Sequence, residues 1–434
     1  MRTKGIQQQK VKVVTLGCSK NLVDSENIIT QLRANDIDTI HEGTGECDVA
    51  IINTCGFIDL AKEESIDAIL DYVDRKQNGL VEKVYVTGCL SQRYRDDLQR
   101  EIPDVDAWFG TMELPALLQK FEVDYRKDLI GDRYLTTVDH YAYLKISEGC
   151  NRTCAFCAIP LMRGKHISQP IERLVDQARH FARRGVRELI LIAQELTYYG
   201  LDIYKKRALP ELLDALCEVE GIEWIRLHYA YPTKFPLEIL DVMKRQRKVC
   251  NYLDIPLQHA SDPVLQRMRR QITRNETETL LNTIREQLPG IAIRTTMLVG
   301  FPGETESDFE SLVRFVEEQQ FERLGVFAYS HEESTSAYEL EDDVPEEVKI
   351  DRVNRLMEVQ RVISNRKNQN RIGEKMRVLI DRKEGDFYYG RSEFDSPEVD
   401  NEIIIPGEHY VRIGDFVDVE IYDALEYDLY GTPL

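Results

Sequence analysis

The chain has 434 residues, 42% of them hydrophobic, which is enough for about three domain cores and excludes global disorder. No apolar run approaches the ~20 residues that cross a bilayer, and residues 1–10 are not followed by the apolar stretch of a secretory signal, so we expect a cytoplasmic protein without a membrane partner. The formal net charge of −20 argues against a general nucleic-acid binder, although solubility alone also explains it.

Residues 11–120 alternate short β-branched runs with amphipathic segments. Three runs predict buried strands, each followed by a helix: 11–18, 49–56 and 84–89. This repetition predicts an α/β fold with a doubly wound parallel sheet. Cys18, Cys55 and Cys89 stand at the carboxyl ends of these strands, the edge where such folds build their sites. We therefore expect the thiols to lie close together, against the alternative of three unrelated buried cysteines.

The rest of the chain continues the strand–helix pattern and then changes. Six candidate strands follow in residues 140–340: 141–147, 188–194, 224–230, 252–258, 293–299 and 323–329. Six βα units predict a partial, TIM-like (βα)6 barrel with its site in the loops after the strands. Residues 346–370 predict a polar connecting helix, and the alternating pattern after it predicts a small antiparallel β-barrel. The expected domains are 1–135, 136–368 and 369–434.

Nine cysteines, an odd number, argue against a disulfide framework and for metal or catalytic use. Three of them we interpret as small buried hydrophobic residues: Cys47, Cys217 and Cys250. The segment CNRTCAFC instead places Cys150, Cys154 and Cys157 in the loop after the first barrel strand. Structural zinc needs four protein ligands, and a thioredoxin-like pair would leave Cys150 without a role. A 4Fe–4S cluster on three thiolates leaves one iron open for a reactant.

The spacing C-x-x-x-C-x-x-C, with Phe156 before the last cysteine, resembles the signature of radical S-adenosylmethionine enzymes. The segments LGCSKNLVDSE, INTCGFIDLAKEES and GCLSQRY are similar to the amino-terminal domain of the methylthiotransferases in that superfamily, and residues 369–434 resemble their TRAM module. The resemblance implies that S-adenosylmethionine binds the open iron of the cysteine loop and is cleaved there to a radical. It also implies a second 4Fe–4S cluster, on the three strand-end cysteines, that carries the transferred sulfur.

Methylthiotransferases divide by substrate, into enzymes for transfer-RNA adenosines and enzymes for an aspartate of ribosomal protein S-twelve. YYGRSEFDSPEVDN, GCNRTCAFCAIPLMRGKHISQP and AQELTYYG resemble the ribosomal-protein branch. Residues 371–434 carry 7 Lys and Arg against 16 Asp and Glu, which repels phosphates and attracts a basic protein, unless these carboxylates only solvate the surface. We expect methylthio transfer to the aspartate β-carbon, giving 3-methylthioaspartate. The expected partners are S-twelve or the small ribosomal subunit, a sulfur donor and an electron donor, with nucleic acid not the main substrate.

Two alternatives stay open. A transfer-RNA adenosine methylthiotransferase would keep the chemistry, and the basic stretch QRMRRQITR favours it unless that stretch is a solvated helix end. An iron–sulfur carrier or scaffold without catalysis belongs to another class. The three-cysteine set weighs against it, because a carrier is expected to complete its cluster ligation.

The segments after the second, fourth and fifth barrel strands supply the other candidates for contact with S-adenosylmethionine. The resemblance implies that the Gln-Glu pair ending the second strand meets the amino group of the cofactor. The glycines of GFPGET either allow close backbone approach or form an ordinary turn. We interpret His259, on IPLQHAS, as a hydrogen-bonded structural histidine rather than a general acid or base. The expected contact residues are Phe156, Gln194, Glu195, Gln258, Gly300 and Gly303.

Overall fold

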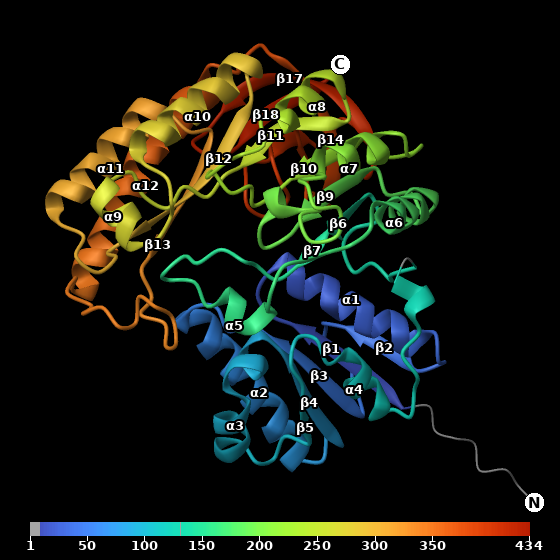
Figure 1. The fold of residues 1–434 in the computed structure, drawn as a ribbon. Helices are drawn as coiled ribbons and strands as arrows, with labels where there is room; N and C mark the ends of the chain where they lie inside the picture. Colours follow the sequence, from blue (N-terminus) through green and yellow to red (C-terminus); the bar gives the residue numbers. More distant parts are fainter. Residues whose placement is uncertain (1–8, 131) are drawn as a thin grey trace, which may run out of the picture. The chain divides into compact units, whose positions relative to one another are not determined.

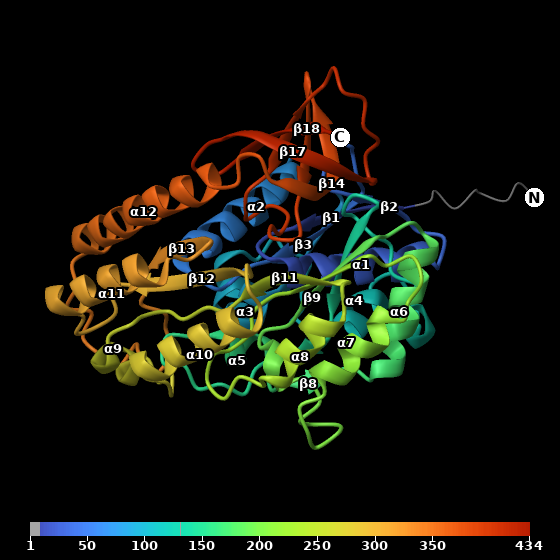
Figure 2. The ribbon, with the colours of Figure 1, turned by 90° about the horizontal axis from the view of Figure 1, so that it is seen from above.

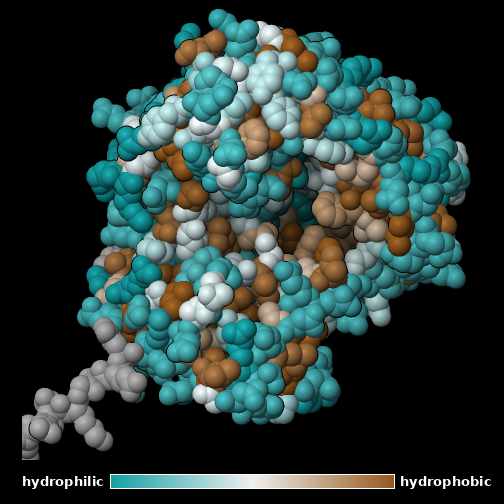
Figure 3. Space-filling model, turned by 180° about the vertical axis from the view of Figure 1, so that it is seen from behind, coloured by the Kyte–Doolittle hydropathy of each residue, from teal (hydrophilic) through white to brown (hydrophobic). Residues whose placement is uncertain are grey.

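The computed structural model describes residues 9–130 and 132–434, which fold as two compact units. The first unit contains the chain up to residue 137 together with 148–151 and 158–167, and the second contains the remainder. Hydrophilic side chains cover most of the face shown in Figure 3, and within the described residues no helix is long and apolar enough to cross a membrane. The three-domain division remains a prediction, because both later domains belong to the second unit.

The first unit is built on a five-stranded parallel sheet in the order β2-β1-β3-β4-β5 (Figure 1). The three predicted strands are present, and the short β2 and β5 were not predicted. The strands are β1 (Lys10–Thr15), β2 (Asp38–His41), β3 (Val49–Thr54), β4 (Lys83–Gly88) and β5 (Ala107–Trp108). The helices are α1 (Ser19–Arg33), α2 (Asp59–Gln77), α3 (Cys89–Glu101), α4 (Leu114–Gln119), the 3-10 helix η1 (Lys127–Ile130) and α5 (Ile159–Arg163).

Helices cover both faces of this sheet, which explains why its strands are apolar along their length. In β3, Ala50 and Ile52 belong to the core formed with α2 and α3, whereas Val49 and Ile51 belong to the core formed with α1 and α4. A strand buried on both faces shows no polar alternation. The predicted doubly wound arrangement is confirmed.

The register of the sheet brings three strand ends to one level. β3 pairs with β1 as far as Asn53 and Thr15, and with β4 as far as Thr54 and Gly88. Since parallel strands end at the same edge, the residues that follow them leave the sheet side by side. The three strand-end cysteines lie in these following residues.

The second unit contains the predicted six-stranded parallel sheet, in the order β13-β12-β11-β10-β9-β6. Figure 2 shows α6, α7, α8 and α10 in a row along one side of it. The strands are β6 (Tyr141–Lys145), β9 (Glu188–Ile192), β10 (Trp224–Leu227), β11 (Val249–Asp254), β12 (Ala292–Val299) and β13 (Arg323–Ala328), with short β7 (Ser147–Glu148) and β8 (Ile167–Ser168) between the first two. The helices are α6 (Ile171–Arg183), the 3-10 helix η2 (Leu196–Tyr198), α7 (Leu209–Cys217), α8 (Glu238–Arg245), α9 (Asp262–Arg267), α10 (Arg274–Gln287), α11 (Glu306–Gln319) and α12 (Glu346–Gln369).

The carboxyl-terminal strands close a barrel in the order β14-β15-β16-β18-β17. The predicted barrel is confirmed, but β16 and β18 pair in parallel while every other pair is antiparallel. Five strands cannot alternate direction all the way around a closed ring, so one pair must be parallel. The strands are β14 (Lys375–Glu384), β15 (Phe387–Arg391), β16 (Ile403–Pro406), β17 (Phe416–Ala424) and β18 (Leu429–Pro433).

A buried layer of charges joins the two barrels of the second unit. Glu188, the first residue of β9, accepts from Arg226 of β10 at 2.7 Å and lies 2.8 Å from Arg391 of β15. Arg391 also donates to Asp381 at 2.6 Å, and Asp381 bonds the ring of His140 at 2.8 Å. Burial alone would raise the pKa of Glu188, but Arg391 and Arg226 hold it below its usual value. The layer is therefore a set of mutually compensated charges.

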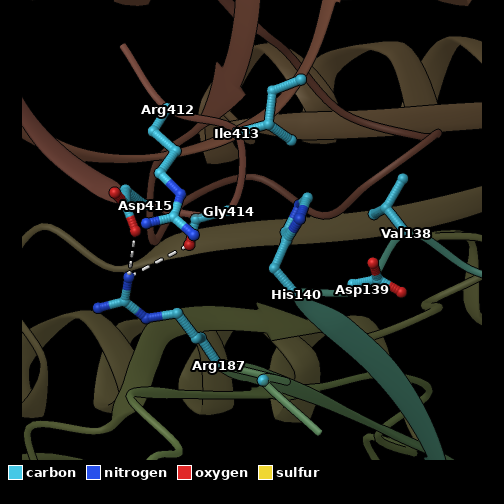
Figure 4. A pocket seen from close by; sticks show the side chains of 9 residues that line it. Val138, Asp139, His140, Arg187, Arg412, Ile413, Gly414 and Asp415 are labelled. Atoms are coloured by element: carbon cyan, nitrogen blue, oxygen red, sulfur yellow. Dashed lines mark hydrogen bonds and ion pairs between the residues drawn. The ribbon is translucent and has the colours of Figure 1, made fainter.

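A pocket of about 460 Å³ opens next to this layer (Figure 4). Arg187 donates to the Gly414 carbonyl and to Asp415, both at 3.2 Å, along one wall. The pocket lies where β6 and β9 begin, which is the opposite end of the strands from the cysteine loop. Its lining residues are Val138, Asp139, His140, Gly185, Arg187, Arg412, Ile413, Gly414 and Asp415.

Candidate functional site

Three thiols gather at the carboxyl edge of the first sheet. Cys18 precedes α1, Cys55 follows β3, and Cys89 begins α3. Burial raises the pKa of Cys89 to about 12, Arg163 lowers it, and the Cys18 and Cys55 thiols raise it further. Burial likewise raises the pKa of Cys55, and Cys18 adds to that rise. In the structure the three predicted cysteines therefore lie close enough for their charges to influence one another.

Arg163 of α5 supplies a buried positive charge at this edge. It donates to the side-chain oxygen of Asn21, which lies 3.8 Å from the Cys89 sulfur. Asn21 in turn donates to the carbonyls of Leu16 and Thr54, at 2.7 and 3.1 Å, and so ties the ends of β1 and β3 together. Sequence analysis identified neither Arg163 nor Asn21, because they stand 142 residues apart and no local pattern links them.

Gly17→Ala is expected to disturb the thiols directly. Gly17 has φ +90°, and a Cβ there would lie 2.7 Å from the Cβ of Cys55 and 2.8 Å from its sulfur. If the three thiols hold one of two clusters, the reconstituted variant should lose about half of its iron and sulfide. Gly43→Ala is the matched control, because Gly43 also has positive φ, +79°, but open space around it. Equal iron content in the two variants would contradict the crowding argument.

The cysteine loop follows β6, as predicted. Cys150 belongs to the first unit, where its N–H donates to the Gly164 carbonyl at 3.1 Å. Cys154 and Cys157 belong to the second unit, where the Cys157 N–H donates to the Cys154 carbonyl at 3.2 Å. All three cysteines are half-buried, and Phe156 packs against an apolar core of the second unit.

Arg152, inside the cysteine loop, is held by a carboxylate and two rings. Its Nη2 lies 3.0 Å from Glu195, and its Cζ lies 3.8 Å from the ring centre of Tyr231 and 4.0 Å from that of Tyr198. The second oxygen of Glu195 accepts from the N–H and hydroxyl of Thr197, at 2.7 and 2.6 Å. Glu195 therefore uses both oxygens to order the cysteine loop and η2. Its predicted contact with S-adenosylmethionine stays a prediction.

Cys154 lies beside a tyrosine and an arginine that sequence analysis did not select. Its sulfur is 3.5 Å from the Tyr231 hydroxyl and 3.4 Å from Nη1 of Arg270. Arg270 is only 3% exposed, so the interpretation of QRMRRQITR as a solvated helix end is wrong for this residue. On either side of it, Arg269 and Gln271 adopt left-handed φ values of +57° and +54°. This turn after α9 directs Arg270 inward.

Gln194 and Gln258 lie at the strand ends where they were predicted. Gln194 follows β9 and is half-buried. Gln258 forms an isolated parallel bridge with Met297 of β12 and has a φ of +76°. A non-glycine residue held in that conformation is typical of functional segments, since the surrounding structure must maintain the strain. Contact of either glutamine with a cofactor stays a prediction.

The two glycines of GFPGET have positive φ, +74° for Gly300 and +76° for Gly303. A Cβ at Gly300 would lie 2.3 Å from the Lys349 side chain of α12, and a Cβ at Gly303 would lie 3.2 Å from the Arg267 guanidinium. The positive φ favours glycine at both positions, and at Gly300 the Lys349 side chain also leaves no room for a Cβ. An approach of the backbone to a cofactor stays a prediction.

His259 is a buried, hydrogen-bonded residue, as we had interpreted it. Its Nδ1 accepts from the Ser261 N–H at 2.9 Å, and its Nε2 lies 3.8 Å from Glu304. Burial lowers the pKa of His259 to about 3 and raises the pKa of Glu304 to about 7. Arg352 forms an ion pair with Glu304 at 3.1 Å and limits that rise.

Glu304→Gln is expected to make the protein more sensitive to acid. The neutral His259 ring contributes its full stability above the unfolded pKa of 6.5, and that contribution is lost as the pH falls toward 3. Between pH 7 and 5 the loss is about 2 kcal/mol. Glu304 opposes it, because a raised pKa lets the folded protein take up a proton between about pH 7 and the ordinary value of 4.5. In Glu304→Gln the denaturation midpoint at pH 5 should fall further below the midpoint at pH 7 than in the wild type. In His259→Gln this difference between the two midpoints should shrink or change sign. Identical pH dependence of the midpoint in both variants would refute this.

The thiols and the cations beside them are compatible with an iron–sulfur cluster. In the described part of the chain, no three His, Cys, Asp or Glu side chains converge closely enough to hold one metal ion. A cubane cluster instead takes one thiolate at each of three separate irons. Cationic groups stand beside both thiol sets: Arg163 near Cys89, and Arg270 near Cys154. Among the described residues Nε of Arg270 has no hydrogen-bond partner, which is unusual for a buried donor and suits a bound anionic group.

Comparison with known proteins gives three family matches along the chain. Residues 10–110 match the uncharacterized protein family UPF0004, residues 144–316 match the radical SAM superfamily, and residues 372–434 match the TRAM domain. The matched segments correspond to the first sheet, the parallel barrel and the closed β-barrel.

Full-length relatives decide the family. The chain is 60% identical to the ribosomal protein uS12 methylthiotransferase RimO of Flavobacterium johnsoniae, over 100% of both chains. It is 60% identical to the RimO of Cytophaga hutchinsonii, over 99% of each, and 50% identical to that of Bacteroides fragilis, over 98% of this chain and 99% of the relative. The chain belongs to the RimO family of ribosomal protein uS12 methylthiotransferases. Family membership includes the radical SAM fold, an iron–sulfur cluster and S-adenosylmethionine.

Solved structures agree on the fold. The radical S-adenosylmethionine methyltransferase TsrM of Kitasatospora setae has a TM-score of 0.52 at 14% identity, covering 74% of this chain and 75% of its own. The cobalamin-dependent radical enzyme OxsB has a TM-score of 0.51 at 14% identity, covering 82% of this chain and 56% of its own. At such low identity the likeness concerns the fold alone.

Proposed function

We propose that this protein is a radical S-adenosylmethionine methylthiotransferase that modifies an aspartate of ribosomal protein uS12, the S-twelve protein of the small subunit. The β-carbon would exchange a hydrogen for a methylthio group, giving 3-methylthioaspartate. The observation that carries the proposal is full-length identity of up to 60% to enzymes of that name, together with two sets of three cysteines at strand carboxyl ends. A ribosomal substrate supports a cytoplasmic location.

The proposal assigns one cluster to each set of thiols. Cys150, Cys154 and Cys157 would hold the cluster that binds S-adenosylmethionine, and the three strand-end cysteines would hold a second 4Fe–4S cluster. When bound, these groups supply a carbon-centred radical for hydrogen removal and a sulfur that accepts a methyl group from another S-adenosylmethionine. The chain's own part is to keep an iron open at each cluster and to order the cysteine loop, through the Arg152–Glu195 pair. A sulfur donor and an electron donor are required as partners.

Charge on the carboxyl-terminal barrel supports a protein substrate over transfer RNA. Of its 16 carboxylates, Asp381, Asp395 and Asp400 are buried in ion pairs with arginines. The exposed residues still number eight acidic against four basic, so the surface stays negative. Such a surface repels phosphates and steers a basic protein toward it. The exposed acidic residues are Glu374, Glu384, Asp386, Glu398, Glu408, Asp418, Glu420 and Asp423.

Anaerobic turnover tests the proposal. The reconstituted enzyme is given S-adenosylmethionine and a reductant, with uS12 and transfer RNA offered in parallel, and mass spectrometry follows both. We expect one added methylthio group on an aspartate peptide of uS12. Modification of adenosine alone would support methylthio transfer and refute uS12 as the substrate. Intact clusters with no transfer to either would favour the non-catalytic alternative.

A further inference from the structure

We infer that Arg270, assisted by Tyr231, is a positioning residue that sets the reduction potential of the cluster at the cysteine loop. The inference rests on the proposed function, because it takes Cys154 as a ligand of that cluster. Arg270 contributes no carbon, hydrogen or sulfur to the reaction. Its Nη1 lies 3.4 Å from the Cys154 sulfur.

The partner of the Arg270 guanidinium is what makes this residue unusual. Arg152, Arg226 and Arg391 are also buried, and each has a carboxylate partner in Glu195 or Glu188. Arg270 has none among the described residues: Nη1 donates to the Cys154 sulfur, Nη2 donates to a backbone carbonyl, and Nε has no partner. An uncompensated buried charge is strongly destabilising. The thiolate of Cys154, and the anionic cluster on it, would supply the missing negative charge.

The local structure fixes Arg270 in that position. Its N–H donates to the Leu265 carbonyl at 3.0 Å, and its carbonyl accepts from the Thr233 hydroxyl at 2.8 Å. Its Cζ lies 4.2 Å from the ring centre of Tyr231. The preceding Met268 carbonyl accepts the N–H of Ala155, at 2.9 Å, in the cysteine loop itself. The turn and the cysteine loop are therefore hydrogen-bonded together, and the Arg270–sulfur distance is held by backbone.

Tyr231 provides the second donor to the same sulfur. Its hydroxyl lies 3.5 Å from the Cys154 sulfur and 3.1 Å from the Arg270 carbonyl, and it has one proton for the two. A ligating cysteine has no proton to give. The Arg270 carbonyl accepts from both Tyr231 and Thr233, so it keeps a donor when the tyrosine proton turns to a ligating sulfur. Cys154 then accepts from a cation and from a neutral hydroxyl.

Both donors favour the reduced cluster. Reduction adds one negative charge, and hydrogen bonds to the ligand sulfur together with net charge are established determinants of cluster potential. Burial keeps the Arg270 charge from being screened by solvent. The expected consequence is a cluster that is easier to reduce, which matters because an electron must reach it before S-adenosylmethionine is cleaved.

The test is an EPR-monitored redox titration of the reconstituted full chain. The cysteine-loop cluster is identified as the signal that changes when S-adenosylmethionine is added. In Arg270→Met, the ratio of reduced to oxidised cluster at a fixed potential should fall about tenfold, which is about 59 mV for one electron. Tyr231→Phe should lower the ratio by a smaller factor, and Arg270→Lys should restore part of the loss. Arg269→Met is the control, because Arg269 is exposed in the same turn.

Each possible result either supports or overturns the role of Arg270 in setting the potential. An unchanged potential in Arg270→Met, or an equal change in Arg269→Met, overturns it. A weaker affinity for S-adenosylmethionine without a change in potential also overturns it, and would make Arg270 a ligand contact. If Arg270→Met binds no cluster, the reduction potentials of Tyr231→Phe and Arg270→Lys test the same role. A protein whose potentials shift as expected but which transfers nothing to uS12 would refute the proposed function and not the role of Arg270.

Discussion

Cys150→Ala is expected to abolish cleavage of S-adenosylmethionine by the reconstituted protein. If Cys150, Cys154 and Cys157 hold the open-iron cluster, as proposed, the removal of one thiolate exposes a second iron and leaves the cluster on two ligands. Without the open-iron cluster no electron reaches the cofactor, so 5′-deoxyadenosine should fall to the background level. Methylthio transfer to uS12 must disappear with it. Chromatography of 5′-deoxyadenosine and mass spectrometry of the uS12 peptide measure the two losses.

Cys55→Ala is expected to separate these two activities. Cys55 lies with Cys18 and Cys89 at the edge of the first sheet, whereas the cysteine loop follows β6. The variant should therefore cleave S-adenosylmethionine close to the wild-type rate and transfer no methylthio group. Its iron content should fall by about half, as in Gly17→Ala.

Cys217→Ala controls for the loss of any buried thiol. Cys217 ends α7, and burial raises the pKa of its thiol to about 11, so it is a protonated core residue. Both activities should survive in this variant. Equal loss of S-adenosylmethionine cleavage in folded Cys150→Ala and Cys55→Ala proteins would refute the assignment of different roles to the two clusters.

The sheets could be predicted because burial on both faces leaves a local signal. β3 contributes to two cores at alternating residues, and its run of apolar side chains follows from that. The placement of the strand-end cysteines follows from parallel pairing alone. β2 and β5 have four and two residues, too few for any periodicity to be visible. Their positions depend on pairing with β1 and β4, which is a tertiary effect.

The charged residues of the site could not be predicted for a different reason. Arginine is rarely buried, so Arg270 in a basic stretch was assigned to solvent. What buries it is a turn with two left-handed residues, Arg269 and Gln271, and a sulfur partner 116 residues away. Arg163 was not selected at all, because its partner Asn21 lies in the first helix, 142 residues away. Long-range pairing of charges leaves no periodic trace in the sequence.

Glu188→Gln is expected to destabilise the second unit by about 3–5 kcal/mol. The side chains of Glu188 and Arg226 are 0% exposed and that of Arg391 is 1% exposed, so solvent does not screen the three charges. Glutamine keeps the shape of the side chain and removes its charge. Arg391 then keeps the carboxylate of Asp381, whereas Arg226 keeps only the backbone carbonyls of Glu393 and Ser392. Chemical denaturation followed by fluorescence should show a lower midpoint.

The loss should come from uncompensated charge rather than from a missing attraction, and a second substitution separates the two causes. Breaking a buried pair leaves a charge without a partner, whereas replacing the whole set by apolar groups is often neutral. Arg226→Met in the Glu188→Gln background removes the orphan cation, so this double variant should recover part of the lost stability. A double-mutant cycle measures the recovery as a coupling free energy. Glu358→Gln, which breaks an exposed pair with Arg361 on α12, should leave the midpoint unchanged. A double variant less stable than Glu188→Gln would mean that Arg226 stabilises the two barrels through the Glu393 and Ser392 carbonyls even without Glu188, and that the layer is not governed by charge balance.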